Sequence, residues 1–344
     1  MREASFSAPG KLILAGEHAV VYGHPALVAA VNLRLHVQAR TDASITGARL
    51  ELPNLGRSES LSWDELFDSH DLDTESLVRQ DLLAKLAVHE TARKLGTRPS
   101  AGLWIRVSSE LPPGSGFGSS AALSVALPAT ILSLLGETPD AKTLESISSR
   151  IEGHQHASPS GIDTAAALNG GVLWAEPRVG GPLTVRPMET IPSWIDRVRV
   201  FQSGVPREGT GVVVKAVARL RHRDPSDTDA HLGILSSCAR ALREDLDEDV
   251  EARRGVCRSL RAAHGALVAL GVVPKSIAET IQRIEDEGGA AKISGAGALT
   301  GPGAGSILVY HPEPERIESW SFLADWQRVE VRLGAPGLRK EKTE

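Results

Sequence analysis

Alternating apolar and polar positions predict a series of strands along the chain. Leu33, Leu35 and Val37 are separated by polar residues, which is the pattern of a strand with one buried face. The same reasoning predicts further strands, at 11–14, 49–52, 103–107, 172–175 and 197–202. Towards the C-terminus we expect a strand, a loop and a strand within 291–310, and a last helix and strand near Leu333.

Apolar residues spaced three or four apart predict helices between these strands. In 76–95, Leu82 and Leu86 share one face, and Gly96 supplies the stop signal. Residues 121–135 form an almost unbroken apolar run, which is typical of a buried helix. Further helices are expected at 141–156, up to Leu168, and at 210–223, 230–246, 252–270 and 275–287. Strands and helices mixed in two blocks indicate an α+β fold.

The chain is long enough for two domains. Its 344 residues can bury two hydrophobic cores without disulfides or a structural metal. Residues 177–195 are rich in glycine, proline and polar side chains, so we divide the chain into domains 1–185 and 186–344. We expect residues 340–344 to be a frayed tail.

Charge and cysteine content exclude several classes of protein. The net charge is −5 and the basic residues are scattered, so we expect no nucleic-acid partner. There is neither a signal-peptide pattern nor an apolar run of membrane-spanning length, and we expect a cytoplasmic protein without a membrane partner. Cys238 and Cys257 belong to no CxxC pair and are interpreted as reduced, partly buried thiols.

Glycine is the one compositional excess, and it is concentrated. Four segments, 9–23, 112–121, 152–171 and 288–305, hold 17 of the 33 glycines. Three glycine runs within them, around Gly10, Gly116 and Gly297, lie beside predicted strand or helix ends. We interpret this excess as backbone of a functional site and not as loose linker.

The second glycine run predicts a phosphate cradle. Its sequence PPGSGFGSS lies between a predicted strand and a predicted helix. Glycines at 114, 116 and 118 allow a close approach to a ligand, and the helix start directs free N–H groups towards an anion. The alternative is a tight turn that only joins strand to helix.

Familiar nucleotide and hydrolase motifs do not fit this run. No lysine follows Gly118, so it is not a Walker A loop, and Ser119 stands where a dinucleotide fingerprint needs its third glycine. The sequence lacks HRD and DFG, which excludes the protein-kinase fold, and it lacks a G-x-S-x-G elbow.

Three charged residues are candidates to complete a phosphoryl-transfer site, which needs cationic charge, a metal and a base. Lys11 enters an apolar strand, although it could be a surface lysine at a strand edge. Asp163 opens a short helix, where a carboxylate can also be a simple cap. Glu152 lies near a helix end that disfavours an acid, and it could be a solvated glutamate. His154 and His156 point apart on a helix end and are not expected to bind a metal.

Four strings together resemble a known family. They are APGKLILAGEHAVVYG at 8–23, PPGSGFGSSAA at 112–122, HASPSGID at 156–163 and KISGAG at 292–297. The glycine strings resemble the GHMP kinase superfamily, and the first and third strings resemble its mevalonate kinase branch. The resemblance implies the two-domain fold of that superfamily, with an N-terminal mixed α/β nucleotide-binding domain, a C-terminal ferredoxin-like α+β domain and an active-site cleft between them.

The resemblance also implies roles for individual residues. Asp163 would be the base that deprotonates the acceptor hydroxyl, beside Lys11. Ser120 and Glu152 would hold Mg²⁺. The nucleotide phosphates would lie against Pro113, Gly114, Ser115, Gly116, Phe117, Gly118, Ser119 and Ser120. The acceptor pocket would contain Lys11, Asp163, Glu17, His18, Gly295 and Ala296.

By the same resemblance, the chain would phosphorylate the primary hydroxyl of (R)-mevalonate with ATP, in isoprenoid synthesis. The alternatives are a sibling GHMP kinase, such as one acting on phosphomevalonate, or a nucleotide-binding relative without catalysis. The third glycine motif departs from the family pattern because residues 298–302 interrupt its glycines. The sequence leaves the oligomeric state open, with a homodimer as the form to test.

Overall fold

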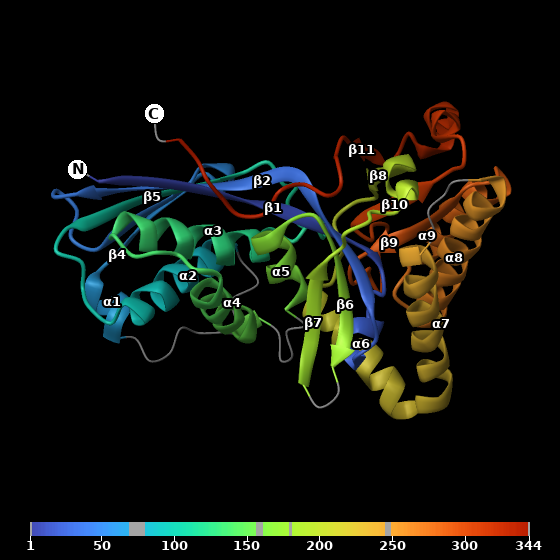
Figure 1. The fold of residues 1–344 in the computed structure, drawn as a ribbon, viewed down its shortest axis with the longest axis horizontal. Coiled ribbons are helices and arrows are strands. Elements are labelled where there is room, and N and C mark those ends of the chain that lie inside the picture. Colours follow the sequence, from blue (N-terminus) through green and yellow to red (C-terminus); the bar gives the residue numbers. More distant parts are fainter. Residues whose placement is uncertain (1, 69–79, 156–160, 179–180, 245–248, 343–344) are drawn as a thin grey trace.

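The computed structural model describes residues 2–68, 80–155, 161–178, 181–244 and 249–342, which form two lobes built on two sheets (Figure 1). The mixture of helices and sheets confirms the α+β class. Most of the chain up to residue 187 builds the lobe around a large sheet, and most of the remainder builds the lobe around a small sheet. The expected boundary between residues 185 and 186 stays a prediction.

The large sheet has eight strands in the order β12-β1-β2-β5-β3-β4, with β6 paired to β2 and β7 paired to β6. Only the β3–β5 pair is parallel among the pairings within it. The strands are β1 (Glu3–Ala15), β2 (Ala26–Asp42), β3 (Ala48–Leu52), β4 (Arg57–Leu61), β5 (Gly102–Ser109), β6 (Val172–Arg178), β7 (Gly181–Pro187) and β12 (Arg339–Lys340). Two strands, β1 and β2, are longer than the predicted ranges because their outer residues continue the same hydrogen-bonded pairing.

Helices cover one face of the large sheet (Figure 1). They are α1 (Trp63–Asp68), α2 (Gln80–Leu95), α3 (Ser119–Leu134), α4 (Ala141–Gln155) and α5 (Ile162–Asn169), with the short turns η1 (Ala19–Tyr22) and η2 (Pro53–Leu55). Nearly all of α3 is buried, which explains its unbroken apolar sequence. The part of the predicted 76–95 helix before residue 80 lies outside the described residues.

The small sheet is antiparallel, in the order β11-β8-β10-β9, and is packed against long helices. Its strands are β8 (Val198–Gln202), β9 (Ala290–Ser294), β10 (Ser306–Tyr310) and β11 (Gln327–Val329). The helices are α6 (Thr210–Arg223), α7 (Pro225–Glu244), α8 (Val250–Ala269) and α9 (Lys275–Asp286), and the short turns are η4 (Ser193–Arg197), η5 (Pro314–Ser319) and η6 (Ser321–Leu323). In α9 the buried residues Ile277, Ile281 and Ile284 follow helical spacing, as predicted.

The expectation of a frayed C-terminal tail is wrong for residues 340 and 341. β12 pairs with β1, and the Glu341 N–H donates to Ser5 O at 2.8 Å. Just before β12, the buried Arg34 guanidinium donates to Pro336 O at 2.8 Å and to Gly337 O at 2.7 Å. The chain end therefore returns from the small-sheet lobe and lies along the large sheet (Figure 1).

Other elements differ from the sequence predictions for local reasons. β4 and α1 were not expected, and β7 lies inside the stretch interpreted as a linker. The final predicted helix is instead the two short 3₁₀ turns η5 and η6. α7 begins five residues earlier than expected because Pro225 is suited to the first helical turn.

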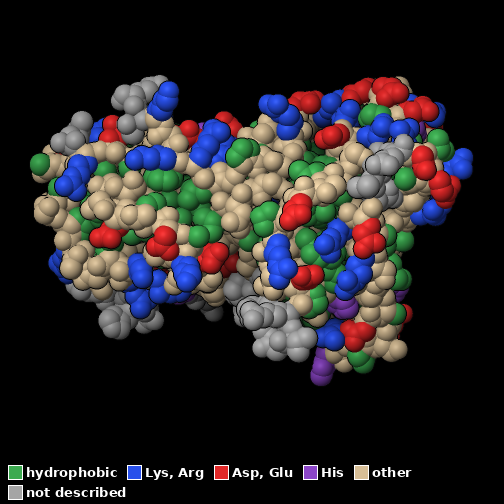
Figure 2. Space-filling view, in the orientation of Figure 1, with side chains coloured by type: hydrophobic (Ala, Val, Ile, Leu, Met, Phe, Trp, Pro, Cys, Tyr) green, Lys and Arg blue, Asp and Glu red, His purple; other side chains and the backbone are tan. Residues whose placement is uncertain are grey.

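Surface and cysteine features agree with the interpretation from composition. Lys and Arg are interspersed with Asp and Glu on the face in Figure 2, without a large patch of one sign. Cys238 and Cys257 are free and buried. Among the described helices, none combines the length and the apolar character that a membrane crossing requires.

Candidate active site

The first and second glycine motifs meet at an irregularity in β1. The register of β1 against β2 shifts between Pro9 and Lys11. There the Lys11 N–H donates to Phe117 O at 2.8 Å, so it joins the loop before α3. A Cβ on Gly10 would lie 2.6 Å from that carbonyl oxygen, which is why only glycine fits.

Lys11 and Asp163 form the charged centre of this region. Lys11 Nζ lies 3.1 Å from Asp163 Oδ1, with a lysine side chain only 7% exposed and an aspartate side chain 36% exposed. The lysine stem passes against Gly118, where a Cβ would lie 2.7 Å from Lys11 Cγ. Three segments that are distant in sequence therefore place a buried cation beside a solvent-accessible carboxylate.

Glu152 lies close to this pair and is itself buried. It accepts a short hydrogen bond from the Thr164 hydroxyl, which belongs to the same helix as Asp163. Burial is the main cause that raises the pKa of Glu152 to about 7; the charge of Asp163 adds to it, and the Thr164 bond and Lys11 oppose it. A carboxylate desolvated next to another carboxylate is ready to accept a cation.

Ser120 lies in the same part of the lobe as Glu152. α3 and α4 are joined by a short connection, and Ser148 Oγ of α4 donates to Ser124 O of α3 at 2.8 Å. Ser120 is one turn before Ser124, and Glu152 is one turn after Ser148. Both positions therefore lie one helical turn from this contact between the two helices. The hydroxyl and the carboxylate are oxygen donors of the kind that Mg²⁺ prefers.

The second glycine loop, defined here as residues 112–118, leads directly into α3. Gly114, Gly116 and Gly118 all have positive φ, and no side chain caps the first turn of α3. The side chains of Ser115 and Phe117 are buried, so these two residues offer only backbone to a ligand. Pro113, Gly114 and Gly116 are exposed, while Gly118, Ser119 and Ser120 are half-buried.

The third glycine loop, defined here as residues 295–305, and the residue that follows it are bound to both other motifs. Ser306 donates from its N–H and from its Oγ to Ser115 O, at 3.1 and 2.6 Å. His18 Nε2 lies 3.0 Å from Ala296 O. Gly295 and Ala296 are half-buried, so part of this loop remains accessible to a ligand.

The interruption within the third loop is anchored away from the second loop. The Ala298 N–H donates to Val272 O at 3.0 Å, and the Leu299 N–H donates to a Glu208 carboxylate oxygen at 3.1 Å. The Thr300 hydroxyl donates to the other Glu208 oxygen at 2.5 Å. The added residues are therefore fixed by the small-sheet lobe.

Glu17 and His18, expected in an acceptor pocket, are buried. Glu17 is fully buried and forms an ion pair with Lys292, which is also fully buried. His18 is 5% exposed and is the described non-glycine residue with positive φ, at 56°. The motif analysis gave no role to Lys292 or Thr164, although both lie inside or directly beside the quoted strings.

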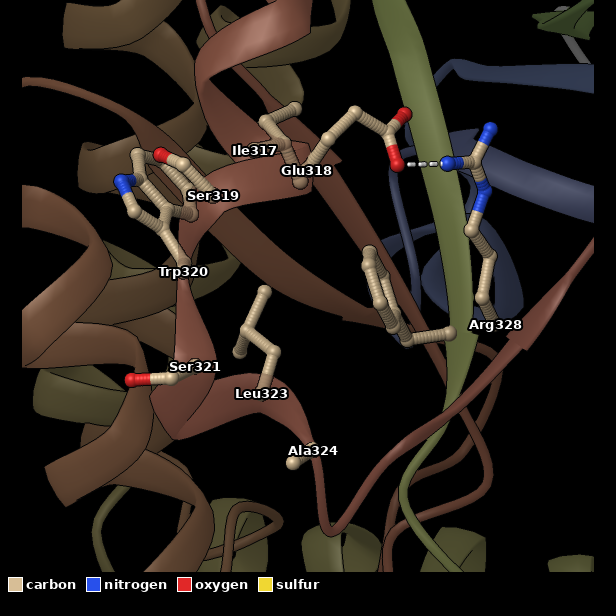
Figure 3. Close-up of a pocket in the computed structure, with 9 residues that line it drawn as sticks. Ile317, Glu318, Ser319, Trp320, Ser321, Leu323, Ala324 and Arg328 are labelled. Carbon is tan, nitrogen blue, oxygen red and sulfur yellow. Dashed lines mark hydrogen bonds and ion pairs between the residues drawn. The ribbon is translucent and has the colours of Figure 1, made fainter.

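Other parts of the molecule offer weaker candidates. No group of three or more His, Cys, Asp or Glu side chains that could hold a metal occurs in the described ranges. His154 approaches Glu90 at 3.5 Å, whereas His156 and residues 157–160 of the third string lie outside those ranges. A shallow pocket beside Trp320 and the Glu318–Arg328 ion pair contains none of the predicted site residues (Figure 3).

Comparisons with known proteins agree with this arrangement of motifs. Residues 81–171 match the family model of the GHMP kinases N terminal domain. The chain is 30% identical to the mevalonate kinase of Thermococcus gammatolerans over 350 residues, which cover 98% of each chain. It is 33% identical to the mevalonate kinase of Aeropyrum pernix over 297 residues, or 86% of each chain.

Solved structures share the fold. The crystal structure of L. major mevalonate kinase in complex with R-mevalonate superposes with a TM-score of 0.73 at 20% identity, covering 96% of this chain and 95% of that one. A phosphomevalonate kinase from Streptococcus pneumoniae gives a TM-score of 0.71 at 13% identity, covering 97% of this chain and all of that one. The two-domain architecture is thus common to kinases of different acceptors.

Proposed function

This chain belongs to the mevalonate kinase family of GHMP kinases, and we propose that it transfers the terminal phosphoryl group of ATP to the primary hydroxyl of (R)-mevalonate. The products are 5-phosphomevalonate and ADP, a step of the mevalonate route to isoprenoids. The observation that carries the proposal is the Lys11–Asp163 pair, 3.1 Å apart against Gly118 of the second glycine loop.

Asp163 acts as the general base in this proposal. Its side chain is half-exposed, can reach a bound hydroxyl and lies beside the Lys11 ammonium group. As the proton leaves the acceptor, Lys11 supplies positive charge next to the developing alkoxide. Burial strengthens that interaction because water does not screen the ammonium group.

The second glycine loop and the start of α3 bind the nucleotide phosphates. The uncapped first turn of α3 and the exposed Gly114 and Gly116 present backbone N–H groups without competing side chains. Ser119 and Ser120 add hydroxyl groups at the helix start. This arrangement holds a polyanion without the lysine of a Walker A loop.

Glu152 and Ser120 would hold Mg²⁺ in the active complex. The fit rests on the buried Glu152 carboxyl, whose pKa is raised mainly by burial and further by the charge of Asp163. Mg²⁺ is usually held by one or two carboxylates together with phosphate oxygens and water, which matches this small donor set. When bound, the metal would neutralise charge on the transferring phosphate.

The acceptor pocket is proposed to lie between the first and third glycine motifs. Gly295 and Ala296 are the accessible members on the third loop. His18 and Glu17 support the pocket without lining it, because their side chains are buried and bonded to the third glycine motif. Acceptor selection would then depend on how closely the third loop approaches Lys11 and Asp163.

A coupled ADP-release assay tests the proposal. The chain is incubated with MgATP and, separately, with (R)-mevalonate, phosphomevalonate, homoserine or galactose. We expect ADP release with mevalonate at least about 100-fold above the other acceptors, because a site that hydrogen-bonds its substrate rejects analogues strongly. Turnover of another acceptor in preference to mevalonate would reject the proposed substrate.

A further inference from the structure

A fully buried ion pair joins the two lobes behind the candidate active site. Glu17 lies two residues after the end of β1, and Lys292 lies in the middle of β9. Lys292 Nζ donates to Glu17 Oε1, and it also donates to Ile293 O at 2.9 Å. Both side chains have zero exposure, and the second oxygen, Glu17 Oε2, has no hydrogen-bond partner in the part of the chain that the structure describes.

Such a pair is a poor source of stability. Removing two ions from water costs several kcal/mol each, so an apolar pair of equal volume is often as stable or more so. Burial raises the pKa of Glu17 against the opposing effects of Lys292 and, less strongly, Lys11. The pair instead restricts how the two segments are placed relative to each other, because a buried charge can be paired in only a few positions of its partner.

The surroundings of Lys292 leave Glu17 as its counter-charge. The charge of Lys292 acts on the titration of His264 of α8 and of Cys238 of α7. Burial lowers the pKa of His264 to about 4, so this histidine is neutral at physiological pH. Loss of the Glu17–Lys292 contact would therefore leave a buried cation facing neutral groups.

The contacts on either side show what the pair aligns. Ser294 Oγ accepts from Ile13 N at 2.9 Å and donates to Ile13 O at 3.0 Å. Two residues further on, Ala296 O bonds with His18 Nε2. Lys292 and Ser294 lie on one face of β9, and Ala296 follows directly after Gly295. All three residues are bonded to β1 or to the loop after it. We call these three contacts the interlobe seam.

The interlobe seam includes the first residues of the third glycine loop. Ile13 is two residues beyond Lys11 on the same strand, and its N–H points to the same edge. At that edge Lys11 binds Phe117 O and Ile13 binds Ser294 Oγ. The interlobe seam thus fixes the position of the third glycine loop relative to the Lys11–Asp163 pair.

We propose that Lys292 is a positioning residue, which acts through Glu17 to hold the third glycine loop in register with Lys11 and the second glycine loop. The catalytic consequence rests on the proposed function, whereas the positioning itself does not. Without the charge on Lys292, residues 294–305 keep their contacts within the small-sheet lobe but lose their fixed position relative to Lys11 and the second glycine loop. Acceptor binding is then impaired more than ATP binding, since the second loop belongs to the other lobe.

Two variants and a control test this role. Lys292→Met keeps the length of the side chain and removes its charge, and Glu17→Gln/Lys292→Met removes both buried charges. Lys275→Met is the control, because Lys275 is 92% exposed and pairs with the exposed Glu279 on α9. For each protein we would measure melting temperature, hydrogen exchange of peptides spanning 294–305, and KM for mevalonate and ATP.

We expect Lys292→Met to lower the melting temperature and to speed exchange of 294–305 at least about tenfold, with peptides of α3 unchanged. The double variant should recover the melting temperature because no unpaired buried charge remains. In both, KM for mevalonate should rise at least about tenfold while KM for ATP changes less than about threefold. The control should match the unmodified chain throughout.

Recovery of the double variant in both exchange and KM would overturn the proposal, because the pair would then contribute only to stability. Unmodified exchange in a folded Lys292→Met variant would overturn it as well. If the unmodified chain does not turn over mevalonate, the proposed function fails alone. The exchange comparison still decides the positioning role, because it needs no acceptor.

Discussion

Substituting Glu152 by glutamine should stabilise the metal-free protein, and the gain should depend on pH. Glu152 is 8% exposed, and the pKa of its carboxyl group is raised from 4.5 to about 7. A raised pKa means that the folded state binds the proton more tightly than the unfolded state does. The stabilisation from protonated Glu152 is therefore complete below pH 4.5 and is lost as the pH rises through 7.

The magnitude follows from the two pKa values. With about 1.36 kcal/mol for each pH interval in which only the folded state holds the proton, ionised Glu152 costs about 3 kcal/mol at pH 8. At pH 5 the same calculation gives less than about 1 kcal/mol. Glutamine has the same size, can still accept from the Thr164 hydroxyl, and does not ionise, so Glu152→Gln should remove this cost.

Urea unfolding in EDTA, followed by tryptophan fluorescence, measures the difference. We expect the free energy of unfolding of Glu152→Gln to exceed that of the unmodified chain by an amount that grows between pH 5 and pH 8. Glu279→Gln, at an exposed position of α9, is the control and should show no such trend. An equal difference at both pH values would refute the reasoning, since Glu152 would then titrate as it does in water. The stabilised variant should also need more Mg²⁺ for activity.

Three further predictions test other parts of the site and fold. Asp163→Ala should lower kcat more than about 100-fold with KM for ATP nearly unchanged, and a mild loss in steady-state kinetics would make Asp163 only a helix-start carboxylate. Gly118→Ala and Gly96→Ala both place a Cβ at positive φ, and each should lower the free energy of unfolding, measured with denaturant, by about 1–2 kcal/mol. Only Gly118→Ala should also lose activity, about tenfold, because its Cβ would displace the Lys11 stem, whereas Gly96 faces open space. Arg34→Met should lower the free energy of unfolding by about 3 kcal/mol, since four hydrogen bonds from the guanidinium are lost. It should also expose the C-terminal segment to proteolysis. Proteolysis no faster than in the control variant Arg332→Met would contradict this.

Local sequence patterns predicted most helices and the position of the second glycine loop. The apolar run of α3 and the isoleucine spacing of α9 depend on short-range periodicity, which the chain alone displays. The resemblance of the strings around Lys11 and Asp163 to the GHMP kinases predicted that these two residues lie side by side. Their close approach follows from β1, α3 and α5 packing in one lobe.

Features that depend on distant partners could not be predicted. β7 lies in a stretch rich in glycine and proline, and it is a strand because β6 pairs with it. β12 looks like a charged tail in sequence, but β1 and Arg34 hold it. Glu17 and Lys292 are 275 residues apart, and neither sequence neighbourhood indicates that the other charge is its partner.

Phosphorus NMR of the reaction mixture tests the central claim most directly. The chain is incubated with MgATP and (R)-mevalonate, and the phosphorus spectrum is recorded with proton coupling. Transfer to the primary hydroxyl predicts a new phosphomonoester signal split into a triplet by the adjacent methylene protons, together with an equal amount of ADP. A spectrum showing only inorganic phosphate and ADP, or unchanged ATP, would contradict the claim that the three glycine motifs form a mevalonate-phosphorylating site.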